Sequence, residues 1–234
     1  NAWAPSIIER KYSDGTYRYF LYYSGHSADL NRKVIGVATA DDPAGPFYDY
    51  GAPIIVDSPV GHGQQIDVDV FQDPVSGKYY IYWGNGYMAG AELEDNMTSV
   101  KENTLTVMTP SGGTLNDYAY REAPYVFYRD GLYYFLWSVD DTGSSNYHIA
   151  YGTANSPLGP VEVAENCVIL IQNPQKEIYG TGHCSVINIP GTDEWRIIYH
   201  RINGHFLTDN PGIHRQVCID RLSFNPDGTI KKVQ

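Results

Sequence analysis

The sequence of 234 residues is poor in cysteine and methionine, with three of each, and poor in basic residues, with 16 Lys and Arg against 27 Asp and Glu. Its three cysteines are Cys167, Cys184 and Cys218, an odd number without metal-ligand spacing, so they indicate neither a metal site nor a particular disulfide. Cys184 and Cys218 lie in apolar, strand-like runs, which predicts buried free thiols.

Charge and hydrophobic length exclude further classes of protein. A formal net charge of −11 disfavours nucleic acid or a strongly anionic glycan as partner, so a neutral substrate fits better. No apolar run approaches the roughly 18–20 residues that cross a membrane, and we expect a soluble domain without a membrane partner. Residues 1–5 have neither the basic start nor the apolar stretch of a signal peptide. Localisation is therefore unknown, and an extracellular or periplasmic location would need a leader further upstream.

Tyrosine is abundant, with 21 residues, and suits strands with one wet face as well as sugar-binding surfaces. Four segments place an aromatic strand after a turn: residues 14–20, 76–83, 130–137 and 191–200. The turns at Gly15, Gly77 and Gly131 are hairpin signals, because glycine tolerates a positive φ. A second motif, residues 39–47, recurs as residues 153–161, two repeat lengths later. The chain therefore consists of internal repeats of about 50–60 residues each.

Each repeat contains the same succession of strands. A short apolar strand precedes the aromatic one, and the four are expected at residues 4–8, 66–71, 123–127 and 184–189. A third strand follows, as at residues 33–39 and 148–152. Three or four strands per repeat without helical periodicity are typical of a propeller blade. We predict an all-β propeller of about four blades, forming a single domain over residues 1–234 because linkers are absent.

The innermost strand of each propeller blade lines the central channel, so polar residues at its start converge. Trp3, Asp67, Glu122 and His183 are predicted to hold equivalent places there. Two carboxylates and an imidazole could supply a general acid and a group that tunes its pKa. Singly, each has a structural explanation: a turn residue for Asp67, an ion pair with Arg121 for Glu122, and a hydrogen-bonded structural histidine for His183. Their shared position favours the functional interpretation.

Four motifs occur in a characteristic order: Trp3-Ala4-Pro5, residues 66–73 with 77–80, residues 122–125, and residues 180–183. They resemble the successive blade signatures of glycoside hydrolase family 43, and residues 215–222 and 227–230 are similar to that family's closing strands. The resemblance covers essentially the whole chain. It implies a five-bladed propeller enzyme that cleaves arabinosyl, xylosyl or galactosyl linkages. Ala123 stands where glycine is usual and Val68 where proline is usual, and neither change removes a functional group.

The resemblance also implies a role for individual residues. Glu122 matches the general acid that protonates the leaving-group oxygen, and Asp67 the aspartate that modulates the pKa of that acid. His183 matches a channel histidine that often holds a metal ion, commonly calcium, largely through water; no organic cofactor is implied. Arg215 matches an arginine that hydrogen-bonds sugar hydroxyls, and Trp3 matches a wall of the subsite for the cleaved sugar.

The general base of such an inverting enzyme has no match here. In the family that aspartate lies on the first blade, upstream of the Trp-Ala-Pro strand, and this chain has four blade units instead of five. Asp69, Asp140 and Asp141 are poor substitutes. We therefore expect the first blade to lie outside this chain, on a separate chain or fragment or on a missing portion, and the chain alone to be a poor enzyme.

The leading hypothesis is an inverting, exo-acting glycosidase acting on an oligosaccharide or a neutral plant or microbial polysaccharide. The alternative is a non-catalytic carbohydrate-binding propeller that kept the pocket and lost the base. The related fructan-cleaving propellers are disfavoured because their Arg-Asp-Pro triplet and Glu-Cys pair are absent from the equivalent strands.

Overall fold

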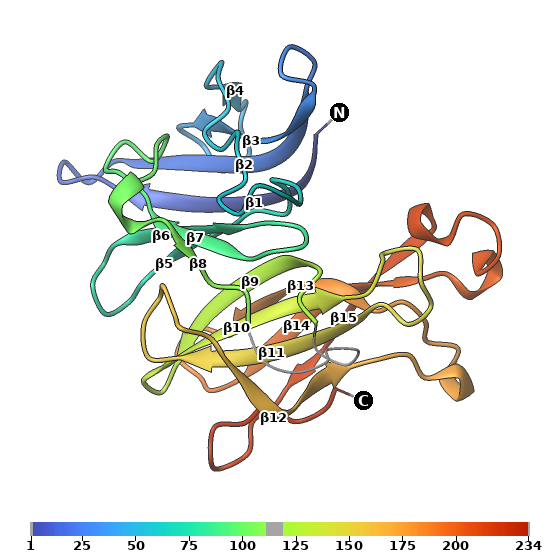
Figure 1. Cartoon of the computed structure of the whole chain (residues 1–234). Coiled ribbons are helices and arrows are strands. Elements are labelled where there is room, and N and C mark those ends of the chain that lie inside the picture. Colours follow the sequence, from blue (N-terminus) through green and yellow to red (C-terminus); the bar gives the residue numbers. More distant parts are fainter. Residues whose placement is uncertain (1, 111–118, 234) are drawn as a thin grey trace. The chain divides into compact units, whose positions relative to one another are not determined.

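The computed structural model describes residues 2–110 and 119–233, which form four antiparallel sheets (Figure 1). Two compact units divide them: Asn1–Thr109 contains the first two sheets, and Pro110–Gln234 the last two. In every sheet the neighbouring strands follow one another in the chain, which is the order of a propeller blade. The all-β prediction with about four blades is confirmed; the prediction of a single domain stays a prediction.

Unit 1 contains two blades of four strands each. The first blade consists of β1 (Ala2–Lys11), β2 (Tyr17–Ser27), β3 (Arg32–Ala40) and β4 (Tyr48–Asp49). The second consists of β5 (Asp69–Gln72), β6 (Tyr79–Trp83), β7 (Ala89–Glu92) and β8 (Thr106–Val107), with the short helix η1 (Glu102–Thr104) before β8. The predicted turn glycines Gly15 and Gly77 have φ values of 86° and 74°, as their hairpins require.

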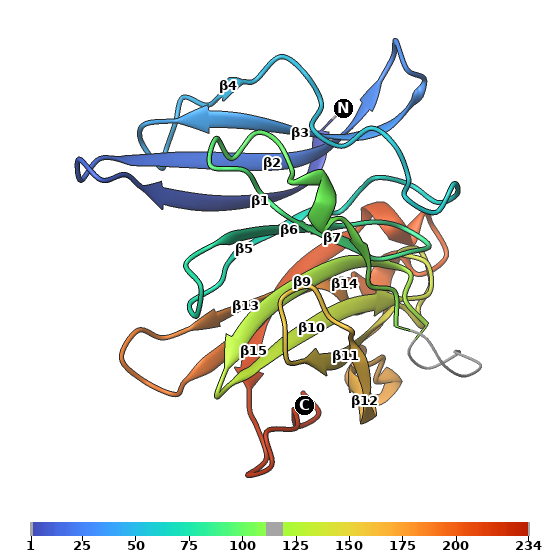
Figure 2. The ribbon, with the colours of Figure 1, turned by 60° about the vertical axis from the view of Figure 1, so that its left-hand side comes forward.

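Unit 2 contains a blade of four strands and a blade of three. The first consists of β9 (Glu122–Arg129), β10 (Leu132–Val139), β11 (His148–Ala154) and β12 (Glu162–Leu170), with β9, β10 and β11 side by side (Figure 2). The second consists of β13 (Gly182–Asn188), β14 (Trp195–Ile202) and β15 (Arg215–Leu222). The helices η2 (Pro174–Lys176), η3 (Gly204–Phe206) and η4 (Pro211–Ile213) lie between these strands. In the described parts of the chain, no helix has the length and apolarity needed to cross a bilayer.

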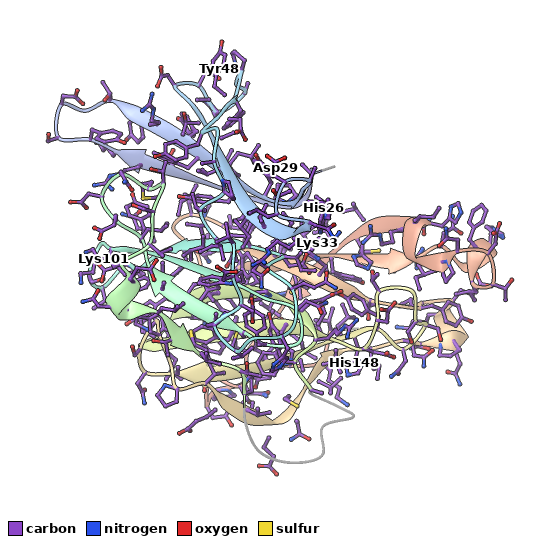
Figure 3. The ribbon with its side chains drawn as sticks, turned by 45° about the horizontal axis from the view of Figure 1, so that its top comes forward. His26, Asp29, Lys33, Tyr48, Lys101 and His148 are labelled. Atoms are coloured by element: carbon purple, nitrogen blue, oxygen red, sulfur yellow. The ribbon has the colours of Figure 1, made fainter. Side chains whose placement is uncertain are left out.

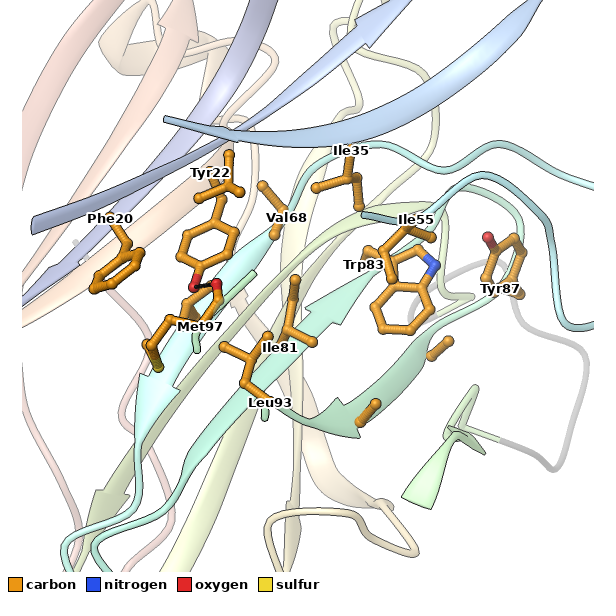
Figure 4. Packing of buried hydrophobic residues seen from close by; sticks show 14 residues of the cluster. Phe20, Tyr22, Ile35, Ile55, Val68, Ile81, Trp83, Tyr87, Leu93 and Met97 are labelled. Atoms are coloured by element: carbon orange, nitrogen blue, oxygen red, sulfur yellow. Dashed lines mark hydrogen bonds between the residues drawn. The ribbon is translucent and has the colours of Figure 1, made fainter. Parts of the chain in front are cut away.

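The core of unit 1 lies between its two blades and mixes aliphatic with aromatic side chains (Figure 4). Phe20 and Tyr22 alternate with outward residues along β2, as side chains of a half-buried strand do. Ile81 and Trp83 face them from β6. The fully buried Tyr22 hydroxyl donates to the carbonyl of Met97 at 2.7 Å, so its polar tip is satisfied inside this core.

The core of unit 2 is dominated by contacts between aromatic rings. Phe127 of β9 stacks on Tyr134 of β10 with ring centroids 4.8 Å apart, and Phe224 packs edge-on against both. The Tyr134 hydroxyl donates to the carbonyl of Gly228 at 2.8 Å. These contacts tie the last residues of the chain to the third blade.

In the described parts of the chain, none of the three cysteines forms a disulfide. Cys167 and Cys184 are buried, whereas Cys218 is only half-buried. The predicted buried thiol is therefore confirmed for Cys184 and overstated for Cys218.

Candidate active site

Within two or three residues of the start of each blade's first strand, one residue lies in the left-handed region of φ. These residues, with their φ values, are Ala4 (46°), Asp67 (59°), Ala123 (60°) and His183 (47°). The four are structurally equivalent, so Trp3 and Glu122 lie one residue earlier in the repeat. The predicted equivalence of Trp3, Asp67, Glu122 and His183 is thus wrong by one residue. The Ala-Pro pairs that follow Trp3 and Glu122 are the sequence signal that gives the true register.

A serine of the preceding blade holds two of these left-handed residues. The backbone N–H of Asp67 donates to Ser24 Oγ at 2.8 Å, and the N–H of His183 donates to Ser138 Oγ at 2.9 Å. Ser24 and Ser138 hold corresponding positions in their blades. Ser24 pairs with Trp3, the residue before Ala4, and Ser138 pairs with Glu122, the residue before Ala123. The same hydrogen bond therefore joins the two blades within each unit.

Unit 1 carries the buried Asp67 and the half-buried Trp3. Figure 3 labels Lys33 on β3. Its ammonium group lies 4.3 Å from the centre of the Trp3 ring, where a cation is attracted to the aromatic face. One face of Trp3 is therefore covered by Lys33. A sugar on this wall would use the other face.

Asp69 is engaged in packing between the blades of unit 1. Its Oδ1 accepts a hydrogen bond from Ser6 Oγ at 3.3 Å, and the same Oγ accepts from the N–H of Val70 at 3.2 Å. Because Asp67 has a positive φ, the chain is not extended there, and Asp67 and Asp69 do not follow the simple alternation of a strand. These contacts explain Asp69 without a catalytic role.

Unit 2 brings Glu122, His183 and Arg215 into mutual electrostatic influence. Glu122 is half-buried at the start of β9, and its Oε1 accepts a hydrogen bond from the Tyr147 hydroxyl at 2.9 Å. Burial lowers the pKa of His183, the negative charge of Glu122 opposes that change, and the positive charge of Arg215 adds to it. His183 is therefore a neutral imidazole at neutral pH, next to the carboxyl group predicted to be the acid.

Sequence reasoning missed two residues of this cluster, Tyr147 and His200. Their rings stack with centroids 5.6 Å apart and an angle of 14° between the planes. Burial lowers the pKa of His200 to about 3, with contributions from the charges of Arg215 and His183. Among the described residues, His200 Nε2 is buried without a hydrogen-bond partner. A signal was available for His200, because it stands opposite Gly182 as Ser138 stands opposite Glu122.

Asp140 and Asp141 shape the loop between β10 and β11. Asp140 Oδ2 accepts from Ser144 Oγ at 2.7 Å, and Asp141 pairs with Arg121 at 3.5 Å. Their carboxylates order the residues that lead to Tyr147. That neither replaces the general base stays a prediction.

The residues around His183 do not form a direct calcium site. Calcium takes about six to eight oxygen ligands in proteins. Within residues 2–110 and 119–233, no three His, Cys, Asp or Glu side chains gather in an arrangement that could hold a metal ion. The groups that shift the pKa of His183 include one carboxylate, Glu122, and one guanidinium, Arg215. Any ion held here would rely on water for most of its ligands.

Glu122 lies at the start of the third blade and His183 at the start of the fourth, where the resemblance predicts an acid and a channel histidine. The sequence profile described as Glycosyl hydrolases family 43 matches residues 1–230. A β-D-galactofuranosidase of Aspergillus niger is 34% identical over 238 residues, which cover 99% of this chain and 65% of that protein. The chain belongs to glycosyl hydrolase family 43, a family of glycosidases, as its motifs predicted.

Solved structures give the same result for the fold. A thermostable family-43 glycoside hydrolase superimposes with a TM-score of 0.82 and 28% identity, covering 100% of this chain and 74% of its own. A compost-metagenome β-xylosidase/α-arabinofuranosidase, solved with xylotriose in a calcium-free form, has a TM-score of 0.76 and 25% identity, covering 99% of this chain and 73% of its own. The family fold is therefore confirmed. The chain spans less than two thirds of the Aspergillus relative's length.

Proposed function

We propose that this chain provides the acid side of the active site of an inverting, exo-acting glycosidase. Glu122 protonates the oxygen of the leaving group, and Asp67 tunes the pKa of Glu122. The substrate is a neutral plant or microbial glycan with terminal arabinosyl, xylosyl or galactosyl residues. Its class agrees with the net charge of −11, which would repel an anionic glycan, and with the activities in the names of the relatives.

The observation that carries this proposal is the environment of Glu122. A half-buried carboxyl group lies at the start of a first strand, accepts a hydrogen bond from Tyr147, and lies within the electrostatic influence of His183. A departing sugar alkoxide is a poor leaving group, and a positioned carboxylic acid removes that difficulty by giving it a proton. In this proposal Arg215 binds hydroxyl groups of the sugar, and Trp3 packs on it with the ring face away from Lys33.

The test is hydrolysis of a panel of arabinofuranosides, xylosides and galactofuranosides by the full-length protein and by Glu122→Gln. Loss of a general acid costs about 10²–10⁴-fold on unactivated linkages. The matched control is Glu162→Gln, an exposed glutamate on β12 of the same blade, which should keep full activity. Inverted stereochemistry of the first-formed sugar, followed by NMR, tests the inverting mechanism. Full activity of Glu122→Gln would contradict the proposal, and sugar binding without hydrolysis by the unmodified protein would favour the carbohydrate-binding alternative.

We further propose that the general base stands on another blade, supplied by a longer polypeptide or by a separate chain, which completes one catalytic domain with these four. An exposed apolar face on the last blade supports this. Ile187, Val217 and Ile219 lie on one face of the β13–β15 sheet by register, and they are 51%, 76% and 64% exposed. Blade faces normally bury such side chains against a neighbour.

An Ile219→Asp variant of the full-length protein tests this packing. If a further blade covers β15, the buried charge should destabilise the domain by about 3 kcal/mol or more. The matched control is Val75→Asp in the β5–β6 turn, which is 66% exposed and should change stability by less than about 0.5 kcal/mol. Equal, small effects of both variants would show that nothing covers the face.

We also propose that His183 is the protein group through which a channel calcium ion is held, mainly by water. A calorimetric calcium titration of the full-length protein and of His183→Ala tests this. The affinity should fall in the variant. No calcium binding by the unmodified protein would contradict the proposal.

A further inference from the structure

The loop between β10 and β11 leaves the blade and returns a tyrosine to the start of β9. Tyr147 is fully buried, which is costly for a phenolic hydroxyl unless it finds a partner. Its partner is Glu122 Oε1 at 2.9 Å. The contact joins residues 25 positions apart in the chain. It therefore depends on the fold of the loop and not on local sequence.

The ring of Tyr147 is fixed on two sides. His200 stacks on it, and Gly182 leaves it room: a Cβ atom at position 182 would lie 2.0 Å from Cε1 and 2.3 Å from Cδ1 of the ring. Any side chain at Gly182 would displace the tyrosine, because interiors do not absorb overlaps of that size. Both neighbours come from the fourth blade, so Tyr147 lies between the two blades of unit 2.

Backbone hydrogen bonds also hold the loop. The N–H of Tyr147 donates to the carbonyl of Ser144 at 3.1 Å, and the N–H of Gly180 donates to the carbonyl of Ser145 at 2.8 Å. Asp140 anchors Ser144 through its hydroxyl. The hydroxyl that reaches Glu122 is thus presented by a loop tied at several points, which is what positioning an acid requires.

We propose that Tyr147 is a positioning residue for Glu122, orienting the carboxyl group so that Oε2 delivers the proton. This inference rests on the proposed role of Glu122 as general acid. Because Oε1 accepts the tyrosine hydrogen bond, it is the carbonyl oxygen of the protonated acid, and the acidic hydrogen is on Oε2.

The proposed hydrolysis moves one proton from Glu122 to the leaving group and one from water to the base. The O–H bond at Oε2 breaks as a bond forms to the glycosidic oxygen, and the bond from that oxygen to the anomeric carbon breaks. Water adds to the anomeric carbon, and its proton passes to the carboxylate base. The Tyr147 hydroxyl keeps its own proton throughout, so the tyrosine orients the acid without exchanging anything with the substrate.

Leaving-group dependence separates this role from a purely structural one. A glycan or alkyl glycoside needs the acid, whereas a dinitrophenyl glycoside departs as a stable anion and does not. Removing the hydroxyl in Tyr147→Phe keeps the ring that packs on His200 and removes only the hydrogen bond. We expect kcat/KM of the full-length enzyme to fall about 10–100-fold on the natural linkage and less than about threefold on the dinitrophenyl glycoside.

The pH profile provides a second readout. A hydroxyl that donates to a carboxyl group favours its ionised form. Without that donor, Glu122 keeps its proton to higher pH, so the alkaline limb of kcat/KM should move upward in Tyr147→Phe. A merely structural defect would lower the profile without moving the limb.

The matched control is Tyr125→Phe on β9, the strand that begins with Glu122. Tyr125 donates to the carbonyl of Val186 at 2.8 Å, so this change also removes one tyrosine hydrogen bond, but one that joins the third and fourth blades and does not involve Glu122. Its losses should be equal on both substrates and its pH limb unmoved. Equal losses on both substrates for Tyr147→Phe, or no loss, would overturn the positioning role. If Glu122→Gln itself keeps full activity on the natural linkage, the proposed function fails first, and the two failures are thereby distinguished.

Discussion

The two units use one backbone design and place different chemistry on it. In unit 1 the left-handed residue held by a serine of the preceding blade is Asp67, and in unit 2 it is His183, with donor–acceptor distances of 2.8 and 2.9 Å. The φ values of these residues differ by little, 59° and 47°. The backbone therefore sets where the side chain begins, and the residue type alone decides whether a carboxylate or an imidazole stands there.

The units also differ in where they bury charge. In unit 1, Glu92 at the end of β7 is 8% exposed and accepts from both Lys78 and Lys101. Burial raises the pKa of Glu92, but the two lysines outweigh burial and the net change is downward. In unit 2 the polar groups near the starts of β9 and β13 include the buried Tyr147 and the half-buried, neutral His183 and His200. Unit 1 thus has an ion network around the buried Glu92 that is separate from Asp67. Unit 2 instead concentrates its polar groups around Glu122.

The strongest test of this comparison changes the two equivalent residues in the same way. If the proposed function is right, Asp67→Asn should lower kcat/KM on unactivated linkages about 100-fold, because it removes the negative charge proposed to tune the acid. His183→Asn should lower it less, because a neutral ring is exchanged for a neutral amide. Steady-state kinetics of the full-length enzyme measure both. Asp69→Asn keeps the acceptor for Ser6 and should stay within about threefold of the unmodified enzyme. Equal losses for Asp67 and His183 would break the comparison.

Gly182→Ala should destabilise unit 2 by about 2–3 kcal/mol, because its Cβ would overlap the Tyr147 ring. The equivalent position in unit 1 is Ile66, which carries a full side chain, so only unit 2 has this constraint. Urea unfolding measures the change. Gly204→Ala, a glycine with open space around it in η3, is the control and should cost less than about 0.5 kcal/mol. A harmless Gly182→Ala would show that the ring can move aside.

Acid should weaken unit 2 through His200. The folded pKa of about 3 lies below the usual 6.5. Between these values the unfolded chain binds more protons than the folded one, so stability falls as the pH falls. The expected loss from pH 7 to pH 5 is about 2 kcal/mol from His200 alone. Hydrogen exchange of β14 amides at both pH values measures it. His200→Gln should flatten this dependence, and an unchanged slope in that variant would assign the effect elsewhere.

The smallest expected effect is a gain. Ala123 has a φ of 60°, which costs an L-residue about 1–2 kcal/mol, and glycine avoids that cost. Because glycine also makes the unfolded chain more flexible, Ala123→Gly should stabilise unit 2 by about 0.5–1 kcal/mol without changing activity. Ala154→Gly on β11, where no left-handed residue is needed, should have the opposite sign. Thermal unfolding distinguishes the two, and a loss in both would contradict the backbone argument.

The sequence predicted the blades well because their signal is repetitive and local. Glycine turns at Gly15, Gly77 and Gly131 and alternating aromatic strands identify each hairpin, and all the expected strands are present within a few residues. The predicted positions of Glu122 and His183 at the starts of β9 and β13 also hold. These features depend on neighbours in the chain, which periodicity can detect.

The contacts made by the loop between β10 and β11 could not be predicted in the same way. Tyr147 precedes β11 without any motif, and its hydroxyl meets Glu122 only because the loop folds back. The one-residue shift between Glu122 and His183 arises from the left-handed residue, which has no fixed identity: alanine, aspartate and histidine all occupy it. A hydrogen bond between residues far apart in the chain leaves little trace in one sequence. The same holds for a left-handed backbone conformation that several residue types adopt.

Exchange of the amide protons in the two serine hydrogen bonds also reports motion of the blades within each unit. The amide protons of Asp67 and His183 end on hydroxyl groups of the preceding blade, Ser24 and Ser138, which are 0% and 1% exposed. Such a proton exchanges with solvent deuterium only when that blade moves away from its neighbour. Two single amides, one per unit, therefore record how often the two blades within each unit separate.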